Sequence, residues 1–257
     1  MSADLRTIRV MRYVTPLREG GSLPAIVEAD DDGLYVLKFR GAGQGPLALA
    51  AELIAGEIGR VLGLRVPELV FMELEEAIGR NEPDPEIREL LVKSAGLNLG
   101  MDYLPGSVMF DPAAGDTCDA ETASKAVWFD AFVTNIDRTA RNANLLVWHK
   151  QLYFIDHGAS LYFHHNWQAP EQMALRPFPA IRDHILLRWA SCIGDVDREL
   201  RERMTEAQLE RIVRLVPDAW LPRESGASKD GYLVYFRERL RAGTFAEEAE
   251  RAHAQLV

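Results

Sequence analysis

The chain has 257 residues, 47% of them hydrophobic, and a formal net charge of −10. A chain of this length and composition can fill a sizeable core, either as one large domain or as two lobes that share a cleft. The negative charge excludes a general polyanion binder, because affinity for a nucleic-acid backbone rests on clustered Lys and Arg. We therefore expect no direct nucleic-acid binding, whereas a local basic pocket for a nucleotide is compatible with this charge.

Short stretches of the sequence bear on three further classes. No run approaches the ~18 to 20 consecutive apolar residues of a membrane-spanning helix, and the N-terminal MSADLRTIRVMR lacks the apolar core of a secretory signal. Cys118 and Cys192 lie far apart, which favours free thiols over a disulfide or a zinc site. His164 and His165 are adjacent in a segment expected to be extended, where side chains point apart, so neither is assigned as a metal ligand. We expect a soluble cytoplasmic protein with no membrane association.

The first part of the chain is rich in predicted strands. AIVEA (25–29) and LYVLKF (34–39) flank an Asp-Asp-Gly turn, which predicts a hairpin. Residues 47–62 place leucine, isoleucine and valine at helical spacing, and Gly63 ends this predicted helix. VPELVFMEL (66–74) is typical of a further strand.

The composition changes after this strand. Residues 75–91 are strongly charged and are expected to form an exposed segment. GLNLGMDYLPG (96–106) combines apolar residues with three glycines and a proline, a composition typical of a connector. We expect the strand-rich half of the chain to end near Met101.

Helical patterns dominate the remainder. Residues 121–135 are the strongest predicted helix, and LLVW (145–148) and LYFI (152–155) predict a second, small hairpin. Beyond Ile181 nearly all of the sequence is helix-like, beginning with DHILLRWAS. The fold class that follows is α+β, with a strand-rich N-terminal half and a helix-rich C-terminal half.

Three polar residues stand near the second hairpin. Asp137 and Asn142 fall in the loop after the predicted helix, and Asp156 ends the second strand, so the three side chains can converge on one point. An amide oxygen and a carboxylate suit Mg²⁺, which takes one or two ligands from the protein and the rest from phosphates and water. A further carboxylate can orient an attacking hydroxyl and accept its proton, which is the role we assign to Asp137. The arrangement thus indicates phosphoryl transfer from ATP.

These residues carry a resemblance to a known family. DRTARN (137–142) followed by IDHG (155–158) resembles the catalytic loop and the metal-binding Asp-Phe-Gly of the protein-kinase-like superfamily, in the variant shared by HipA-type kinases and phosphatidylinositol 3/4-kinases. Over residues 10–190 the chain is most similar to the HipA-like kinase family. The resemblance implies a bilobal protein-kinase-like fold, with an N-terminal lobe at 1–101, a helical C-terminal lobe at 102–257 and an ATP cleft between them.

The resemblance also assigns roles to single residues. It makes Asn142 and Asp156 the magnesium ligands. Lys38, in YVLKF, resembles the lysine that holds the ATP phosphates, and Glu52 resembles the helix glutamate that pairs with it. Glu57 lies on the same predicted helix and is the alternative partner, which the family spacing favours less.

Two segments are implied in nucleotide binding by their position. A short glycine loop would cover the phosphates, and the connector resembles the hinge between the lobes. The loop residues are Gly20, Gly21 and Ser22, and the hinge residues are Met101, Asp102 and Tyr103.

The sequence departs from the family motifs at two positions. His157 replaces the Phe of Asp-Phe-Gly, and Thr139 stands where a His often follows Asp-Arg. Arg138 and Arg141 have two interpretations, as ligands of a phosphate or substrate acid and as salt-bridge partners of the acidic surface.

The resemblance implies a bacterial-type serine/threonine kinase that uses ATP and Mg²⁺ and acts on a protein hydroxyl. One alternative is a small-molecule or lipid-headgroup kinase, favoured if the pocket beyond Asp137 is closed and acidic. Another is a pseudokinase scaffold that binds a nucleotide or a partner. Analogy with the family also allows a regulatory protein partner, for which the sequence encodes no contacts.

Overall fold

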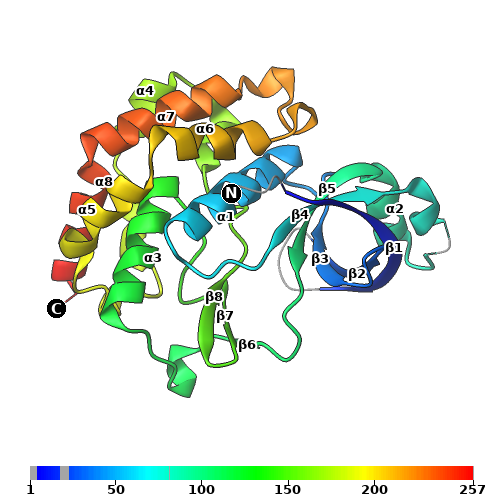
Figure 1. Cartoon of the computed structure of the whole chain (residues 1–257), viewed down its shortest axis with the longest axis horizontal. Coiled ribbons are helices and arrows are strands. Elements are labelled where there is room, and N and C mark those ends of the chain that lie inside the picture. The colour runs from blue at the N-terminus through cyan, green and yellow to red at the C-terminus, as the bar shows by residue number, and fades with distance from the viewer. Residues whose placement is uncertain (1–4, 18–22, 81, 257) are drawn as a thin grey trace.

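The computed structural model describes residues 5–17, 23–80 and 82–256, and it shows a curled sheet beside a larger helical body (Figure 1). The sheet is a closed barrel with the strand order β1-β2-β3-β5-β4. Its strands are β1 (Thr7–Pro16), β2 (Ala25–Ala29), β3 (Leu34–Lys38), β4 (Leu69–Leu74) and β5 (Gly96–Asp102). Neighbours are antiparallel except β1 and β4, which are parallel and close the barrel. The predicted first hairpin is confirmed as β2 and β3.

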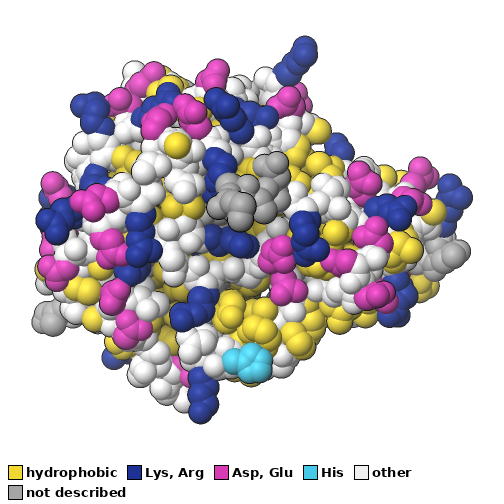
Figure 2. Space-filling view, viewed as in Figure 1, with side chains coloured by type: hydrophobic (Ala, Val, Ile, Leu, Met, Phe, Trp, Pro, Cys, Tyr) yellow, Lys and Arg dark blue, Asp and Glu magenta, His cyan; other side chains and the backbone are white. Residues whose placement is uncertain are grey.

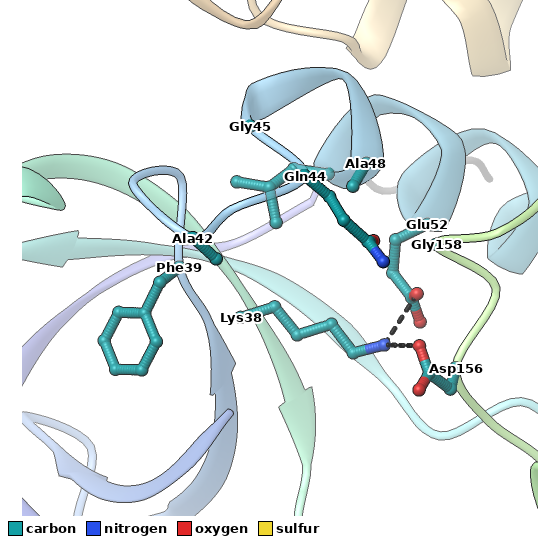
Figure 3. A pocket seen from close by; sticks show the side chains of 10 residues that line it. Lys38, Phe39, Ala42, Gln44, Gly45, Ala48, Glu52, Asp156 and Gly158 are labelled. Atoms are coloured by element: carbon teal, nitrogen blue, oxygen red, sulfur yellow. Dashed lines mark hydrogen bonds and ion pairs between the residues drawn. The ribbon is translucent and has the colours of Figure 1, made fainter. Parts of the chain in front are cut away.

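Strand β3 has two faces with different surroundings. Tyr35 and Leu37 are buried in the barrel interior, in the smaller of two hydrophobic cores. Val36 and Lys38 point the other way, because successive side chains alternate across a strand, and Val36 packs on the larger core. The alternation therefore directs Lys38 out of the barrel and toward helix α1 (Pro46–Val61), as Figure 3 shows.

Helix α1 connects the barrel to the helical body. It packs against α6 (Glu206–Leu215), where Oε2 of Glu57 lies 3.3 Å from a guanidinium nitrogen of Arg211. Trp220, just beyond α6, donates its indole N–H to the carbonyl of Leu97 on β5 at 3.1 Å. Although α1 belongs to the N-terminal half of the sequence, C-terminal helices hold it in place.

Strand β5 corrects one expectation. The composition of residues 96–106 predicts a connector, whereas residues 96–102 form a strand between β3 and β4. The glycine at position 100 serves close packing, because a Cβ there would lie 2.4 Å from the sulfur of Met72. Asn98 is buried, and its side-chain amide bonds three backbone groups around the strand. The polar and small residues of this segment therefore support a buried strand.

The charged segment after β4 is also more ordered than its composition indicates. Part of residues 75–91 belongs to helix α2 (Pro85–Lys93). The helix begins at Asp84, whose side chain accepts a hydrogen bond from the N–H of the second helical residue. Ile87 and Leu91 are buried against the barrel core.

The C-terminal part is helical, as the sequence predicts, and carries a small sheet of order β6-β7-β8 that contains the predicted second hairpin. The strands are β6 (Val108–Met109), β7 (Leu145–Trp148) and β8 (Gln151–Phe154), and the helices besides α6 are α3 (Ala120–Val133), α4 (Pro170–Ala174), α5 (Ile193–Arg203), α7 (Lys229–Ala242) and α8 (Thr244–Ala254). Residues 183–191 look helical in sequence but form short 3-10 turns, because His184 is drawn into a bridge with Thr139. Both cysteines are free.

On the face drawn in Figure 2, acidic and basic side chains are interspersed, and an apolar stretch lies over the small sheet and the segment that leads to it. No helix in the described part of the chain is both long enough and apolar enough to cross a membrane.

Candidate active site

A lysine and two carboxylates meet where β3, α1 and the segment after β8 come together (Figure 3). The Nζ atom of Lys38 lies 2.7 Å from Oε2 of Glu52 and 2.6 Å from Oδ1 of Asp156. Only 1% of the Glu52 side chain is exposed, compared with 46% of the Asp156 side chain. Glu52 therefore holds the lysine from the buried side, and Asp156 faces the open side of the cluster.

The ion cluster shifts the pKa of each member. Burial opposes the charge on Lys38, but the carboxylates of Asp156 and Glu52 outweigh it, so the pKa of the lysine is raised. The positive charge of Lys38 lowers the pKa of Asp156. Burial raises the pKa of Glu52, although Lys38 acts in the opposite direction. The cluster as a whole keeps the lysine charged.

Glu57, the alternative partner for Lys38, points elsewhere and pairs with Arg211 of α6. Glu52 lies on the helix face toward β4, one turn before Gly56. A Cβ at position 56 would lie 2.7 Å from a leucine side chain of β4, so the helix approaches the sheet closely on this face. This close approach brings Glu52 within reach of the lysine.

The loop after α3 holds Asp137 beside Asn142. Nδ2 of Asn142 donates to Oδ2 of Asp137 at 2.7 Å, and the backbone N–H of Asp137 donates to Oδ1 of Asn135 at 3.1 Å. The buried Asn144 lies between the two parts of the site, with Nδ2 3.4 Å from Oδ2 of Asp137 and 3.5 Å from the carbonyl of Asp156. The side chain of Asn144 thus links the Asp137 loop to the Asp156 segment.

The donor atoms suit a divalent cation. Asp156 uses one carboxylate oxygen for Lys38 and has a second oxygen that accepts no hydrogen bond from the described residues. Asn142 uses its amide NH₂ for Asp137, which leaves its carbonyl oxygen for another ligand. Such hard oxygen donors suit Mg²⁺ and Mn²⁺. Within the described residues no three His, Cys, Asp or Glu side chains gather as a metal-binding group.

A buried charge network lies beneath the Asp137 loop. Nε of Arg138, whose side chain is 0% exposed, donates to Oδ2 of Asp130 at 2.6 Å. Nε2 of His184 donates to the same oxygen at 2.8 Å, and Asn135 donates to the other oxygen at 2.9 Å. Burial alone would raise the pKa of Asp130, but Arg138 outweighs it and holds the pKa well below its ordinary value. Arg138 therefore forms a salt bridge with a buried aspartate, and not with the acidic surface that the sequence analysis named.

The same arginine reaches the segment that ends in Asp156. Arg138 donates to the carbonyls of Asn144 and Ile155, and its Nη2 atom lies 3.0 Å from Nδ1 of His157. Because an arginine can only donate, Nδ1 accepts, and the neutral ring carries its proton on Nε2. Burial lowers the pKa of His157 to about 3. The histidine at the Phe position of the motif thus adds a hydrogen bond to the packing that a phenyl ring would supply.

Sequence reasoning missed Asp130 and His184. The available signal for Asp130 is one acidic residue inside the apolar run AVWFDAFV of α3, where every neighbour is buried. A charge on the buried face of a helix needs a partner, and that rule alone would have directed attention to Arg138. His184 carries no comparable signal in the sequence.

Two cavities open at this site. A small one of about 30 Å³ lies beside Lys38 and Asp156 (Figure 3). A larger one of about 430 Å³ contains Asp137. Gln44 and Gly158 line both cavities, so the ion cluster and Asp137 lie on either side of a shared wall.

The other residues with predicted roles are less fully defined. The predicted glycine loop at 20–22 lies outside the described residues. The predicted hinge residues 101–103 stand at the end of β5, where the N–H groups of Asp102 and Tyr103 donate to backbone carbonyls of neighbouring segments. These two N–H groups are therefore already used in hydrogen bonds within the protein.

His164 and His165 converge, contrary to the expectation from sequence. They lie in a 3-10 turn (Tyr162–Asn166), and their Nε2 atoms are 3.2 Å apart. Consecutive residues of a 3-10 turn do not point to opposite sides as in a strand, because the turn has about three residues per revolution. Nδ1 of His164 lies 2.9 Å from the hydroxyl of Tyr232, and His165 lines the cavity that contains Asp137.

The barrel, the helical body and the Lys38 ion cluster define a chain of the protein-kinase-like superfamily. A model of the HipA-like kinase family matches residues 10–244, and this chain belongs to that family. The assignment from the sequence is confirmed, and the family and fold support an ATP-dependent kinase. A search of curated proteins found no match.

Solved kinase structures share the fold. The Golgi casein kinase with Mn and ADP bound has 10% sequence identity and a TM-score of 0.55, over 96% of this chain and 74% of that chain. The proinflammatory kinase CtkA of Helicobacter pylori has 14% identity and a TM-score of 0.54, over 98% of this chain and 99% of that chain. At these identities the likeness concerns the fold alone, and it confirms the predicted bilobal α+β kinase architecture.

Proposed function

We propose that this chain transfers the terminal phosphate of Mg-ATP to a Ser or Thr hydroxyl of a protein. The observation that carries the proposal is the pairing of Lys38 with both Glu52 and Asp156, next to the cavity that contains Asp137. Phosphoryl transfer needs a cation for the phosphates, oxygen ligands for a metal ion and a base for the acceptor hydroxyl. The four side chains and Asn142 supply these groups within one site.

In this proposal the nucleotide lies between an N-terminal lobe, residues 1–101, and a helical lobe, residues 102–257. Lys38 holds phosphate oxygens, and the buried Glu52 fixes the direction in which the lysine points. The base of the nucleotide lies near the hinge.

Asn142 and Asp156 would hold the magnesium ion through the oxygens that their protein hydrogen bonds leave over. Bound there, the ion would supply positive charge that offsets the negative charge of the phosphates. The presence of Mn and ADP in the structurally similar Golgi casein kinase supports a nucleotide and a divalent ion at such a site.

Asp137 is the proposed base. Asn142 fixes its Oδ2 atom, and the N–H bond to Asn135 fixes its backbone. The hydroxyl oxygen of the acceptor forms a bond to the terminal phosphorus, the bond from that phosphorus to the bridging oxygen of ADP breaks, and the hydroxyl proton passes to the carboxylate of Asp137.

A protein acceptor is favoured over a small molecule or a lipid headgroup that carries a negative charge. The larger cavity is lined by no lysine or arginine among the described residues, so an anionic acceptor would find no counter-charge there. A catalytically inactive scaffold does not need all of the residues that the kinase motifs require, and this chain has Lys38, Asp137, Asn142 and Asp156 together.

The test is incubation of the purified chain with magnesium and ATP labelled on its terminal phosphate, beside an Asp137→Ala variant. We expect label on a Ser or Thr of the chain or of an added protein with the wild type, and none with the variant. Release of ADP without labelled protein would indicate that the acceptor is a small molecule. If ATP with magnesium neither reacts nor raises the melting temperature, the kinase proposal is overturned.

A further inference from the structure

The cavity that contains Asp137 has an unusual charge balance for a site that handles phosphate. Its volume is about 430 Å³, and its lining includes one carboxylate, that of Asp137, but no lysine or arginine among the described residues. The other polar groups are the amide of Gln44, the hydroxyl of Tyr162 and the imidazole of His165, and burial lowers the pKa of His165. Among the described residues that line this cavity, an acidic group would meet the carboxylate of Asp137 and no lysine or arginine, and the whole chain carries a net charge of −10.

Two large hydrophobic side chains line the same cavity and are exposed at its rim. Ile136 is 41% exposed and Tyr162 is 57% exposed. Single exposed hydrophobic residues are common on protein surfaces. Two of them beside the proposed base are less ordinary, because exposed apolar groups that cluster at a cavity mark binding sites.

The backbone holds both side chains at the rim. Ile136 stands between Asn135, which is buried and bonded to Asp130, and Asp137, which is bonded to Asn142. The neighbours on both sides are therefore held by hydrogen bonds, which hold the backbone that carries Ile136 in place.

Tyr162 is fixed in a similar way. It lies between the fully buried Leu161 and a turn whose His164 is also fully buried. The N–H of Leu161 donates to the carbonyl of Val133 at 2.8 Å, and the N–H of His164 donates to the carbonyl of Leu161 at 2.8 Å. A side chain presented on a rigid backbone loses little freedom when it binds a partner.

We infer that this site accepts a Ser or Thr in an extended protein segment whose neighbouring residues are apolar and not acidic, with an apolar side chain packed between Ile136 and Tyr162. The inference rests on the proposed function and adds the chemistry of the acceptor. Charge complementarity disfavours acidic and phosphorylated segments, and the exposed rim supplies the apolar contact.

The experiment uses peptides with one central Ser, in which the two flanking positions are Leu, Phe, Ala, Lys or Glu and all other positions are fixed. We expect the Leu and Phe peptides to be labelled about tenfold faster than the Ala peptide at low concentration, because an apolar contact of this size discriminates by about that factor. The Glu peptide should be labelled more slowly than the Ala peptide.

Variants of the rim test the assignment to these two residues. Tyr162→Ala and Ile136→Ala should raise the KM for the Leu peptide about tenfold and remove most of its advantage over the Ala peptide, with a smaller change in kcat. Tyr162→Phe should keep the preference, because the ring is retained. Leu175→Ala is the matched control, since Leu175 is 50% exposed and does not line this cavity.

Three outcomes would overturn the inference. One is equal labelling of the Leu, Ala and Glu peptides by the wild type. A second is a Leu preference that survives in the Tyr162→Ala, Ile136→Ala double variant. The third is labelling of a small polyol with no labelling of any peptide. This result would agree with ATP-dependent phosphoryl transfer and would reject only the protein acceptor. Failure of ATP and magnesium to bind at all would instead reject the kinase function itself.

Discussion

Arg138 and Asp130 form an ion pair in which both side chains are fully buried, with Nε 2.6 Å from Oδ2. Arg138 directly follows Asp137, and its guanidinium also bonds the carbonyls of Asn144 and Ile155. One side chain thus joins the loop of the proposed base to the segment of the proposed metal ligand. Because Arg138 bonds both segments, we expect loss of the pair to lower stability and activity together.

Removal of one partner from this pair should destabilise the fold strongly. We expect Arg138→Met to lower the free energy of unfolding by about 3 to 5 kcal/mol, because it leaves the carboxylate of Asp130 buried without its main counter-charge. Urea unfolding followed by circular dichroism measures the change. Arg12→Met is the matched control, because Arg12 pairs with Glu28 on the surface and its loss should have a much smaller effect.

The double variant Arg138→Met, Asp130→Leu separates charge from packing. Since it removes both buried charges, it should recover part of the stability that the single variant loses. A single variant as stable as the wild type would show that the pair does not hold the two segments.

Mild acid should destabilise the fold through buried histidines. His157 and His164 each have a pKa of about 3 because burial disfavours the charged ring, against an ordinary value of 6.5. In the unfolded chain these rings bind protons below pH 6.5, whereas in the folded chain they stay neutral until about pH 3. The free energy of unfolding should therefore fall as the pH drops from 6.5 toward 3.

Unfolding in urea at pH 7, 6, 5 and 4 tests this dependence. His157→Phe and His164→Phe should each flatten the slope between pH 6.5 and 4, even where they lower the stability at pH 7. Asp130 acts in a lower range: its pKa is depressed from 3.8, so the stability it contributes is present above that value and is lost as the pH falls further. An unchanged slope in both histidine variants would contradict the neutral, buried state of these rings.

Two glutamates of α1 offer a matched pair for the lysine site. Glu52→Gln should lower kcat/KM for ATP roughly ten- to hundredfold, because a hydrogen bond to a charged group contributes about 1.5 to 3 kcal/mol. Glu57→Gln makes the same change of charge on the same helix, but Glu57 contacts Arg211 and not Lys38. Steady-state kinetics with varied ATP should show a large effect for the first variant and little for the second. Equal effects would mean that α1 acts through its position alone.

Much of this architecture follows from local pattern. Strand alternation and an Asp-Gly turn place β2 and β3, and helical spacing places α1 and α3. The spacing of Asp137, Asn142 and Asp156 is set by one loop and one hairpin, which are local in sequence, so the sequence alone can place these three residues near one another. Glu52 was preferred over Glu57 on family spacing, and the contact with Lys38 agrees with that choice.

The features that sequence reasoning missed depend on contacts between distant segments. In the sequence, Gly100 and Asn98 are typical of a connector. In the structure, Gly100 leaves room for the side chain of Met72, and the buried amide of Asn98 bonds the backbone beside β5. His184 reaches Asp130 across 54 positions of the chain, and no local period marks such a contact. The 3-10 turn that brings His164 to its neighbour is likewise decided by burial of the ring beside α7.

Asn142 and Asn144 should differ in what they do for the metal site. Asn142 is half-buried, with a carbonyl oxygen left for a ligand, whereas Asn144 is buried and has a positive φ of 49°. We expect Asn142→Ala to raise the magnesium concentration for half-maximal activity about tenfold or more, with little change in melting temperature, and chelation of divalent ions to abolish transfer in every variant.

For Asn144 the backbone should decide the result. Asn144→Ala puts alanine in the left-handed region at a cost of about 1 to 2 kcal/mol, because alanine lacks the short polar side chain that lets asparagine adopt this conformation, whereas Asn144→Gly adopts the same φ without that strain. Thermal unfolding should therefore rank the wild type above the glycine variant and the glycine variant above the alanine variant. Since Asn144 is not a proposed ligand, a magnesium titration should give nearly the same half-maximal concentration in the wild type and the glycine variant. A large shift in the glycine variant would instead make Asn144 the ligand and Asn142 the residue that positions Asp137.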